Sequence, residues 1–306
     1  MIGVVTLVFV LFNILPGDPA RMMLGQRADE KSIETIHQEL GLDKPLHHQY
    51  CKYIYDLSHF DLRRSYQSGK PVVDILKEAF PNTIYLALLS IAIAFVLGVT
   101  LGALAAVFKD GWLEKIILVV TSLGMSLPSF FAAILIAWVF AFLLADYTGL
   151  SMFGSLWSVD DFGEGEYLSL KNIILPAITL GIRPLAVITE LTKSTMKEVL
   201  EQDYIRTAKA KGLSNFKIIY SHALRNTLNP IVSSISGWFA SLIAGAVFVE
   251  YIFDWKGVGV VIVDSLEKYD FPVLMGALIV ICVILIIINV LTDIIYALLD
   301  PRVRIK

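Results

Sequence analysis

The sequence predicts an all-α membrane protein with six transmembrane helices. Hydrophobic residues make up 56% of the 306 residues and charged residues only 17%, and the mean hydropathy is +0.70. These values are typical of polytopic membrane proteins and not of soluble domains. In addition, several uncharged runs are long enough to cross a bilayer, and a short basic segment separates two of the apolar runs. That segment cannot itself lie in the hydrocarbon core.

The first helices to be assigned are the long uncharged runs. A helix needs roughly 20 apolar residues to cross the hydrocarbon core, and four runs satisfy this: 83–108, 116–145, 227–249 and 271–292. The second run is longer than the core is thick, at about 1.5 Å per residue. We therefore expect it to tilt or bend, with the bend at Pro128.

Two further runs are less regular. Residues 172–189 are apolar apart from Arg183, which is followed by Pro184, a helix breaker. Residues 2–15 would form only about 21 Å of helix, less than the core of about 30 Å. We count 1–15 as the first transmembrane helix and expect that the true start lies upstream or that the chain is truncated.

The charges between the runs predict the orientation. The stretch 193–225 holds seven Lys and Arg, and the tail 300–306 holds Arg302, Arg304 and Lys306. The loop 146–171, in contrast, has five acidic residues and one lysine. Basic loops stay in the cytoplasm, so we expect both termini and the 193–226 loop there. An extracytoplasmic segment at 16–80 and a five-helix domain at 81–299 complete the division of the chain.

The basic loop is patterned as two short helices around a glycine. Gly212 interrupts the first helical pattern, and Ser214 can cap a second one. The apolar residues recur at helical spacing in both, at Leu200, Tyr204 and Ala208 and then at Phe216, Ile219, Tyr220 and Leu224. A loop built in this way predicts a docking surface for a partner protein. The alternative is a basic loop that rests on anionic lipid headgroups.

No pattern in the sequence predicts catalysis. A phosphate-binding G-x-x-x-x-G-K-[ST] loop is absent, and no nucleophile lies near a base in the sequence. The outer segment contains His37, His47, His48 and His59, but without cysteine partners or helical ligand spacing they do not predict a metal site. Two cysteines, Cys51 and Cys282, predict no disulfide framework. We expect neither an enzyme nor a cofactor bound by this chain.

A resemblance to a known family follows from the basic loop. Residues 204–213 read YIRTAKAKGL and residues 222–226 read HALRN. The loop resembles the coupling motif of ATP-binding-cassette importer permeases, in the variant of the dipeptide/oligopeptide/nickel transport family. The general form of that motif is met only at Ala208, Gly212 and Leu224.

Further motifs along the chain strengthen the resemblance to the first permease subunit of such systems. They are PGDP at 16–19, LGLDKPL at 40–46, PNT at 81–83, SLPSF at 126–130, Glu250-x-Ile252-Phe253, Gly257-x-Gly259, Asp270-x-Pro272, Asn289-x3-Asp293-x2-Tyr296 and DPR at 300–302. The chain departs from the family pattern at Lys256, where proline is usual, and at 60–63, where FDLR replaces a glycine-flanked Asp-Leu.

The resemblance implies a type I importer permease fold with a cytoplasmic coupling helix, in a cell (inner or plasma) membrane. The implied partners are a homologous second permease, two cytoplasmic P-loop ATPase subunits that bind the ATP, and an extracytoplasmic solute-binding protein. The residues implied in coupling to the ATPase are Tyr204, Arg206, Ala208, Lys211, Gly212, Leu213, His222 and Leu224. The solute stays open between dipeptides, oligopeptides, nickel chelates, glutathione and oligosaccharides.

Polar residues in or near the spans are candidates for a gate or for pairing between helices: Arg183, Glu190, Glu250, Asn289 and Asp293. For Glu250, a gate and a simple position at the water boundary are both open. Rows of small residues at 94–106 and 237–245 predict close helix packing, either within the chain or at a subunit interface. The alternative function is a secondary transporter or channel that works without an ATPase.

Overall fold

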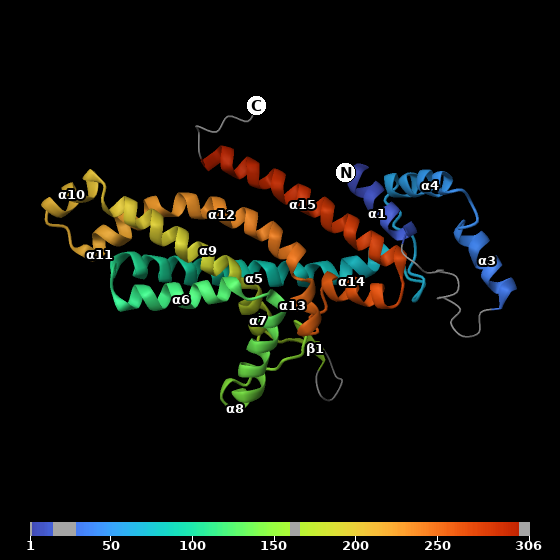
Figure 1. Ribbon diagram of the computed structural model, residues 1–306, viewed down its shortest axis with the longest axis horizontal. Helices are drawn as coiled ribbons and strands as arrows, with labels where there is room; N and C mark the ends of the chain where they lie inside the picture. Colours follow the sequence, from blue (N-terminus) through green and yellow to red (C-terminus); the bar gives the residue numbers. More distant parts are fainter. Residues whose placement is uncertain (1, 15–28, 160–165, 300–306) are drawn as a thin grey trace. The chain divides into compact units, whose positions relative to one another are not determined.

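The structure, a computed structural model, describes residues 2–14, 29–159 and 166–299 (Figure 1). The chain divides into two compact units, one formed by residues 1–83 and 256–287 and the other by 84–255 and 288–306. The described residues are mostly helical, as the sequence predicts. The predicted motifs at 16–19 and 300–302 lie outside the described residues.

The first unit contains the N-terminal helices and one end of each of two long helices. Its elements are α1 (Ile2–Ile14), α3 (Glu30–Leu40), α4 (Leu46–Ser58), the start of α5 (Val72–Val107), α14 (Val258–Glu267) and the start of α15 (Phe271–Leu299). Helix α3 ends at Gly41, which has a φ of +70°. A left-handed residue is the usual end of a helix, and glycine adopts it without a Cβ clash. Phe9, Tyr53 and Ile279 form the buried core of this unit.

A buried carboxylate holds part of the outer segment in this unit. Asp270 is buried and accepts hydrogen bonds from the Tyr66 amide at 3.0 Å and from the Ser65 hydroxyl. Burial raises the pKa of the neighbouring Tyr66 phenol, and the Asp270 charge adds to that effect. A buried carboxylate needs such donors. The aspartate of the motif Asp270-x-Pro272 therefore has a structural role in this chain, because it holds Ser65 and Tyr66 of the outer segment in place.

The PNT motif has a similar role. The Asn82 side-chain amide donates to the Lys256 carbonyl at 2.7 Å, and the Val258 amide donates to the Thr83 hydroxyl at 2.9 Å. These bonds connect α5 to the loop that starts α14. Helix α5 itself begins at Val72, eleven residues before the predicted start at residue 83. Hydropathy predicts where the apolar span begins and not where the helix begins. A helix can extend beyond the apolar span, because its backbone N–H and C=O groups are hydrogen-bonded to one another in water as well.

The second unit contains the remaining helices of the bundle. Its elements are the end of α5, α6 (Trp112–Ser126), α7 (Ser129–Ile136), the π-helix η2 (Ala137–Leu143), α8 (Ala145–Thr148), β1 (Trp157–Val159), β2 (Glu166–Leu168), α9 (Ile174–Leu200), α10 (Asp203–Ala210), α11 (Asn215–Lys217), the π-helix η3 (Ile218–Ala223), α12 (Leu224–Gly245) and α13 (Val247–Ile252). Helix α9 packs against α6, α7 and α12 (Figure 1). The antiparallel pair β1–β2, with Ser158 opposite Tyr167, is a small addition that the all-α prediction missed.

The two rows of small residues behave differently. A Cβ on Gly102 would lie 2.5 Å from the Thr189 carbonyl oxygen, and one on Gly98 would lie 2.8 Å from the Ile188 side chain. This first row therefore lets α5 and α9 approach closely within the chain. A Cβ on Gly237 or Gly245 would meet nothing within 4 Å. Among the residues that the structure describes, nothing packs against the second row at these two glycines.

The spans agree in part with the six predicted helices. Within the described residues, three helices are long and apolar enough to cross a membrane, α5, α9 and residues 271–292 of α15, and the number becomes five if two bent pairs each count as one span. One of these pairs is α6 with α7 and η2, bent by 114° at the predicted position, Pro128. Helix α1 is apolar but short. Pro184 does not interrupt α9, which runs to Leu200, beyond the predicted end at residue 189.

Candidate functional site

The basic loop has a short helix on each side of a glycine turn, as the sequence predicts, but the second one is not separate: α11 continues through η3 into α12. Gly212 has a φ of +75°, and its amide donates to the Lys209 carbonyl at 2.9 Å. The Leu213 amide donates a hydrogen bond to the Ala208 carbonyl at 3.3 Å. This is the hydrogen-bond pattern that ends a helix at a left-handed residue. Ser214 begins the next turn and accepts a long bond of 3.4 Å from the Lys217 amide.

One face of this loop is part of the protein core. The buried residues Ile205, Ala208, Ile218 and Ala223 pack with Met196 of α9, and Leu213 covers them in part. Ala208 and Leu213 therefore support the loop from inside and do not form the exposed apolar face that their spacing suggested. Leu224 is likewise half-buried, against a second core cluster. The inner face of the loop is therefore packed directly against the helices behind it.

The opposite face of the loop is exposed and carries aromatic rings. Phe216 is 77% exposed and Tyr220 66%, and their rings lie parallel with centroids 6.1 Å apart. The Tyr204 hydroxyl accepts a hydrogen bond from the Asn226 side chain at 2.8 Å, which ties α10 to α12. The sequence places Phe216 and Tyr220 on the second helix but does not predict that both rings are exposed. Their spacing of four residues on a short amphipathic helix was the available signal.

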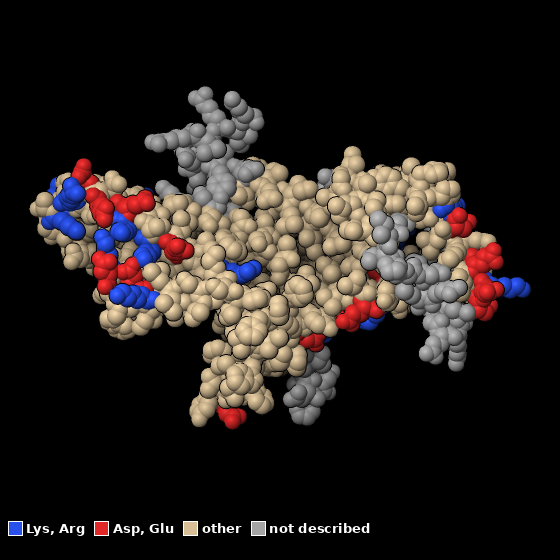
Figure 2. All heavy atoms as spheres, in the orientation of Figure 1, with Lys and Arg blue, Asp and Glu red and all other residues tan. Residues whose placement is uncertain are grey.

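Charged residues surround the aromatic pair. Arg206, Lys209, Lys211 and Lys217 are all exposed, and Figure 2 shows acidic side chains mixed with basic ones at the end of the molecule that carries α10. Arg206 lies 3.3 Å from Asp203. Exposed pairs of this kind contribute little to stability, so these charges remain available to a partner. His222 is half-buried, and its carbonyl accepts from Asn226 at 3.2 Å.

An ion pair braces the helices that carry the loop. The Lys193 ammonium of α9 lies 2.5 Å from the Glu114 carboxylate of α6, and both side chains are largely buried. Partly buried pairs are screened less than exposed ones. The loop is therefore carried by helices that are themselves tied together.

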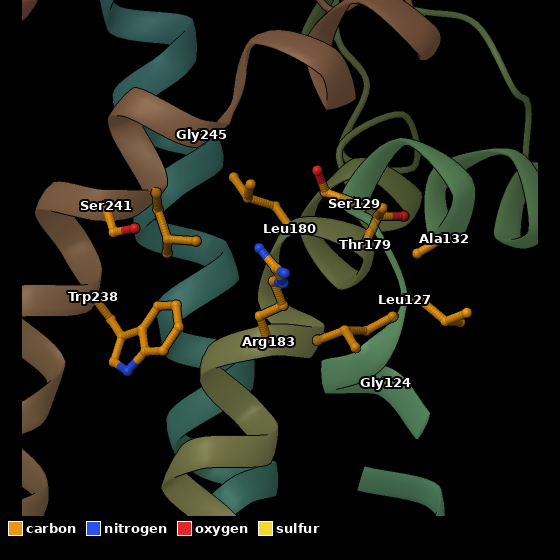
Figure 3. Close-up of a pocket in the computed structure, with 12 residues that line it drawn as sticks. Gly124, Leu127, Ser129, Ala132, Thr179, Leu180, Arg183, Trp238, Ser241 and Gly245 are labelled. Atoms are coloured by element: carbon orange, nitrogen blue, oxygen red, sulfur yellow. The ribbon is translucent and has the colours of Figure 1, made fainter. Parts of the chain in front are cut away.

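A cavity of about 80 Å³ lies between α6, α7, α9 and α12 (Figure 3). Its lining residues on α9 end at Arg183, whereas α9 reaches the basic loop only after Leu200. Arg183 lines this cavity on its open side, since its side chain is exposed in this chain. Figure 3 shows its guanidinium between Trp238 and Ser241 on one side and Thr179 on the other. Glu190, two turns further along α9, is exposed and is not among the lining residues.

The other polar candidates lie apart from this cavity. Glu250 of α13 is fully buried, with 0% exposure. Its carbonyl accepts from the Trp255 amide at 2.8 Å. Asn289 is exposed on α15, while the side chain of Asp293 lies outside the described residues.

Two family models cover almost the whole chain. Residues 98–305 match the inner membrane component of binding-protein-dependent transport systems, and residues 1–87 match the N-terminal part of the same kind of membrane component. The chain is 35% identical to the probable D,D-dipeptide transport system permease protein DdpB of Escherichia coli strain K12, over 98% of this chain and 93% of that protein. It is 38% identical to a putative peptide transport system permease protein of Brucella abortus strain 2308, over 99% and 95%.

A third relative has a different named solute. The glutathione transport system permease protein GsiC of Escherichia coli O6:H1 is 35% identical over 98% of this chain and 93% of that protein. Among solved structures, inward-facing conformations of the MetNI methionine ABC transporter share the fold, with a TM-score of 0.58 at 15% identity. The match covers 74% of this chain and 97% of that chain. The chain belongs to the binding-protein-dependent transport system inner membrane component family, and it is a permease subunit of an ATP-driven importer.

Proposed function

We propose that this chain forms half of the translocation path of a peptide importer and receives the ATPase stroke through residues 201–226. Its partners are a homologous second permease, two cytoplasmic P-loop ATPase subunits and an extracytoplasmic solute-binding protein. Both termini and the basic loop face the cytoplasm in this proposal. The peptide solute is favoured by the relatives named for dipeptides and peptides.

The observation that carries the proposal is the two-faced basic loop. Its inner face is part of the core, through Ile205 and Ile218, and its outer face presents Phe216 and Tyr220 among basic side chains. Aromatic residues beside charge are typical of protein interfaces. A lipid-binding basic patch needs charge but neither a defined turn nor a core behind it.

The left-handed turn at Gly212 provides the first test. Gly212→Val forces a β-branched residue into a conformation that costs about 1–2 kcal/mol, although no atom lies within 4 Å of the new Cβ. We expect the variant to insert into the membrane but to lose ATP-driven uptake and stimulated ATP hydrolysis, because α10 and α11 no longer meet at the required angle. Both activities are measured in proteoliposomes that contain the whole complex.

A matched control is available at Gly149, which ends α8 with a φ of +61°. A Cβ there would meet only the Lys171 ammonium, at 3.8 Å. Gly149→Val carries the same backbone strain away from the basic loop and should retain coupling. Normal uptake by the Gly212→Val complex would refute the coupling role.

Affinity purification of the chain from its native membrane tests the partners. We expect the second permease and the ATPase subunits to be recovered with it and identified by mass spectrometry. Recovery of the chain alone, with solute movement driven by an ion gradient, would support a secondary transporter instead.

A further inference from the structure

The cavity around Arg183 combines one cation with several uncharged side chains. Of the twelve described residues that line it, Arg183 alone carries a charge. Hydroxyl groups come from Ser129, Thr179 and Ser241. In the part of the chain that the structure describes, no carboxylate forms an ion pair with the Arg183 guanidinium. The volume of about 80 Å³ is several times what one water molecule needs, so a small anionic group can enter.

A helix N-terminus adds positive potential to the same cavity. Helix α7 begins at Ser129, directly after the 114° bend, and Ser129 lines the cavity (Figure 3). Its first helical hydrogen bond runs from the Ala132 amide to the Pro128 carbonyl. The amides before Ala132 therefore have no helical acceptor, and they carry the positive end of the helix dipole. In membrane proteins, broken helices often direct such ends at anionic ligands.

We expect the open side of the cavity to face another subunit or water and not lipid. An arginine in the hydrocarbon core is costly, and it normally faces the interior of a bundle or a water-filled path. On α12 the cavity is bounded by Ser241 and Gly245. The space around Gly245 is open, since a Cβ there would meet nothing within 4 Å. The α12 side of the cavity therefore has room for a passing solute. The contact between α5 and α9, in contrast, is closely packed and leaves no such room.

We propose that this cavity is a transient binding site for a carboxylate of the transported solute, held by the Arg183 guanidinium with the N-terminus of α7 and the Ser241 hydroxyl beside it. Arginine suits this role because its planar group donates two parallel hydrogen bonds to a carboxylate. The proposal rests on the proposed function, since it requires that the cavity belong to the translocation path.

The test measures the charge preference of the cavity with thiol reagents and does not need the identity of the solute. Ser241→Cys, in the assembled complex in native membranes, is treated with anionic 2-sulfonatoethyl methanethiosulfonate or with cationic 2-(trimethylammonium)ethyl methanethiosulfonate. We expect the anionic reagent to be favoured. Adding Arg183→Gln should lower the ratio of anionic to cationic rate on the order of tenfold, because a nearby unit charge acts with opposite sign on the two reagents. Arg183→Lys, which retains the charge, should preserve the ratio.

Native Cys51, which is exposed in the outer segment, serves as the internal reference, and site-resolved mass spectrometry separates its thiol from the introduced one. The rate ratio at Cys51 should not change with Arg183. A ratio at the introduced thiol that is indifferent to Arg183→Gln would overturn the proposal, as would the absence of labelling at Ser241→Cys by either reagent, which would show a dry interface. The proposed function is tested separately. If the complex still contains the second permease and the ATPases and still imports its solute, either of these two results overturns the binding site but not the proposed function.

Discussion

At the scale of single residues, the departure from the family pattern at residues 60–63 coincides with backbone strain. Phe60 and Arg63 have φ angles of +59° and +66°, at the two positions where the family pattern has glycines around Asp-Leu. A side chain in this left-handed conformation costs about 1–2 kcal/mol. Arg63 offsets part of that cost, since its guanidinium donates two bonds of 3.1 Å to Asp56. Phe60 is 88% exposed and gains nothing comparable.

We therefore predict that Phe60→Gly stabilises the first unit by about 0.5–1 kcal/mol, since glycine accepts the left-handed backbone but also gains entropy in the unfolded chain. Arg63→Gly should destabilise it, because the bonds to Asp56 are lost. Thermal unfolding of the two purified variants in detergent measures both effects. Equal shifts of the two midpoints in the same direction would contradict the explanation.

At the scale of elements, packing separates two glycine rows that look alike in the sequence. The row on α5 is in contact with α9, whereas Gly237 and Gly245 of α12 have no described atom within 4 Å of an added Cβ. The difference follows from which neighbour each helix meets, and periodicity contains no information about that. A row that stays open in a membrane helix is available to another subunit or to the solute path.

A pair of alanine substitutions tests this distinction. Gly102→Ala places a Cβ 2.5 Å from backbone and side-chain atoms, and we expect a loss of about 1–3 kcal/mol from overpacking. Gly237→Ala meets open space and should leave the stability of the isolated chain unchanged or increase it slightly, because alanine favours helix. Unfolding in mixed micelles compares them, and a comparable loss in both variants would refute the contrast.

At the scale of the whole molecule, the chain presents an exposed aromatic surface where a partner is proposed to bind. Phe216 and Tyr220 are well exposed on a segment that is supported by buried residues. Exposed aromatic rings of this kind are typical anchors of interfaces. The second unit has other exposed aromatics, such as Tyr147 of α8, at 88%, which belong to the predicted outer side.

We predict that the double substitution Phe216→Ala with Tyr220→Ala weakens binding of the ATPase subunits about 10- to 100-fold, as expected for the loss of about 1.4–2.7 kcal/mol at an interface centre. Tyr147→Ala is the matched control and should bind normally. Co-purification at graded salt and subunit concentration measures the affinity. Full retention of the ATPases by the double variant would exclude these rings as anchors.

The sequence by itself determined the helical membrane class, the bend at Pro128, the two-helix loop around Gly212 and the family. Each of these depends on local chemistry: apolar length, proline geometry, glycine conformation and an ordered set of motifs. Only the tertiary structure decided that Ala208 is buried while Phe216 is exposed, that Glu250 is fully buried, and that Arg183 shares a cavity with the start of α7. Those facts depend on which helices meet, and contacts between residues far apart in the chain are not encoded in the spacing along any one helix.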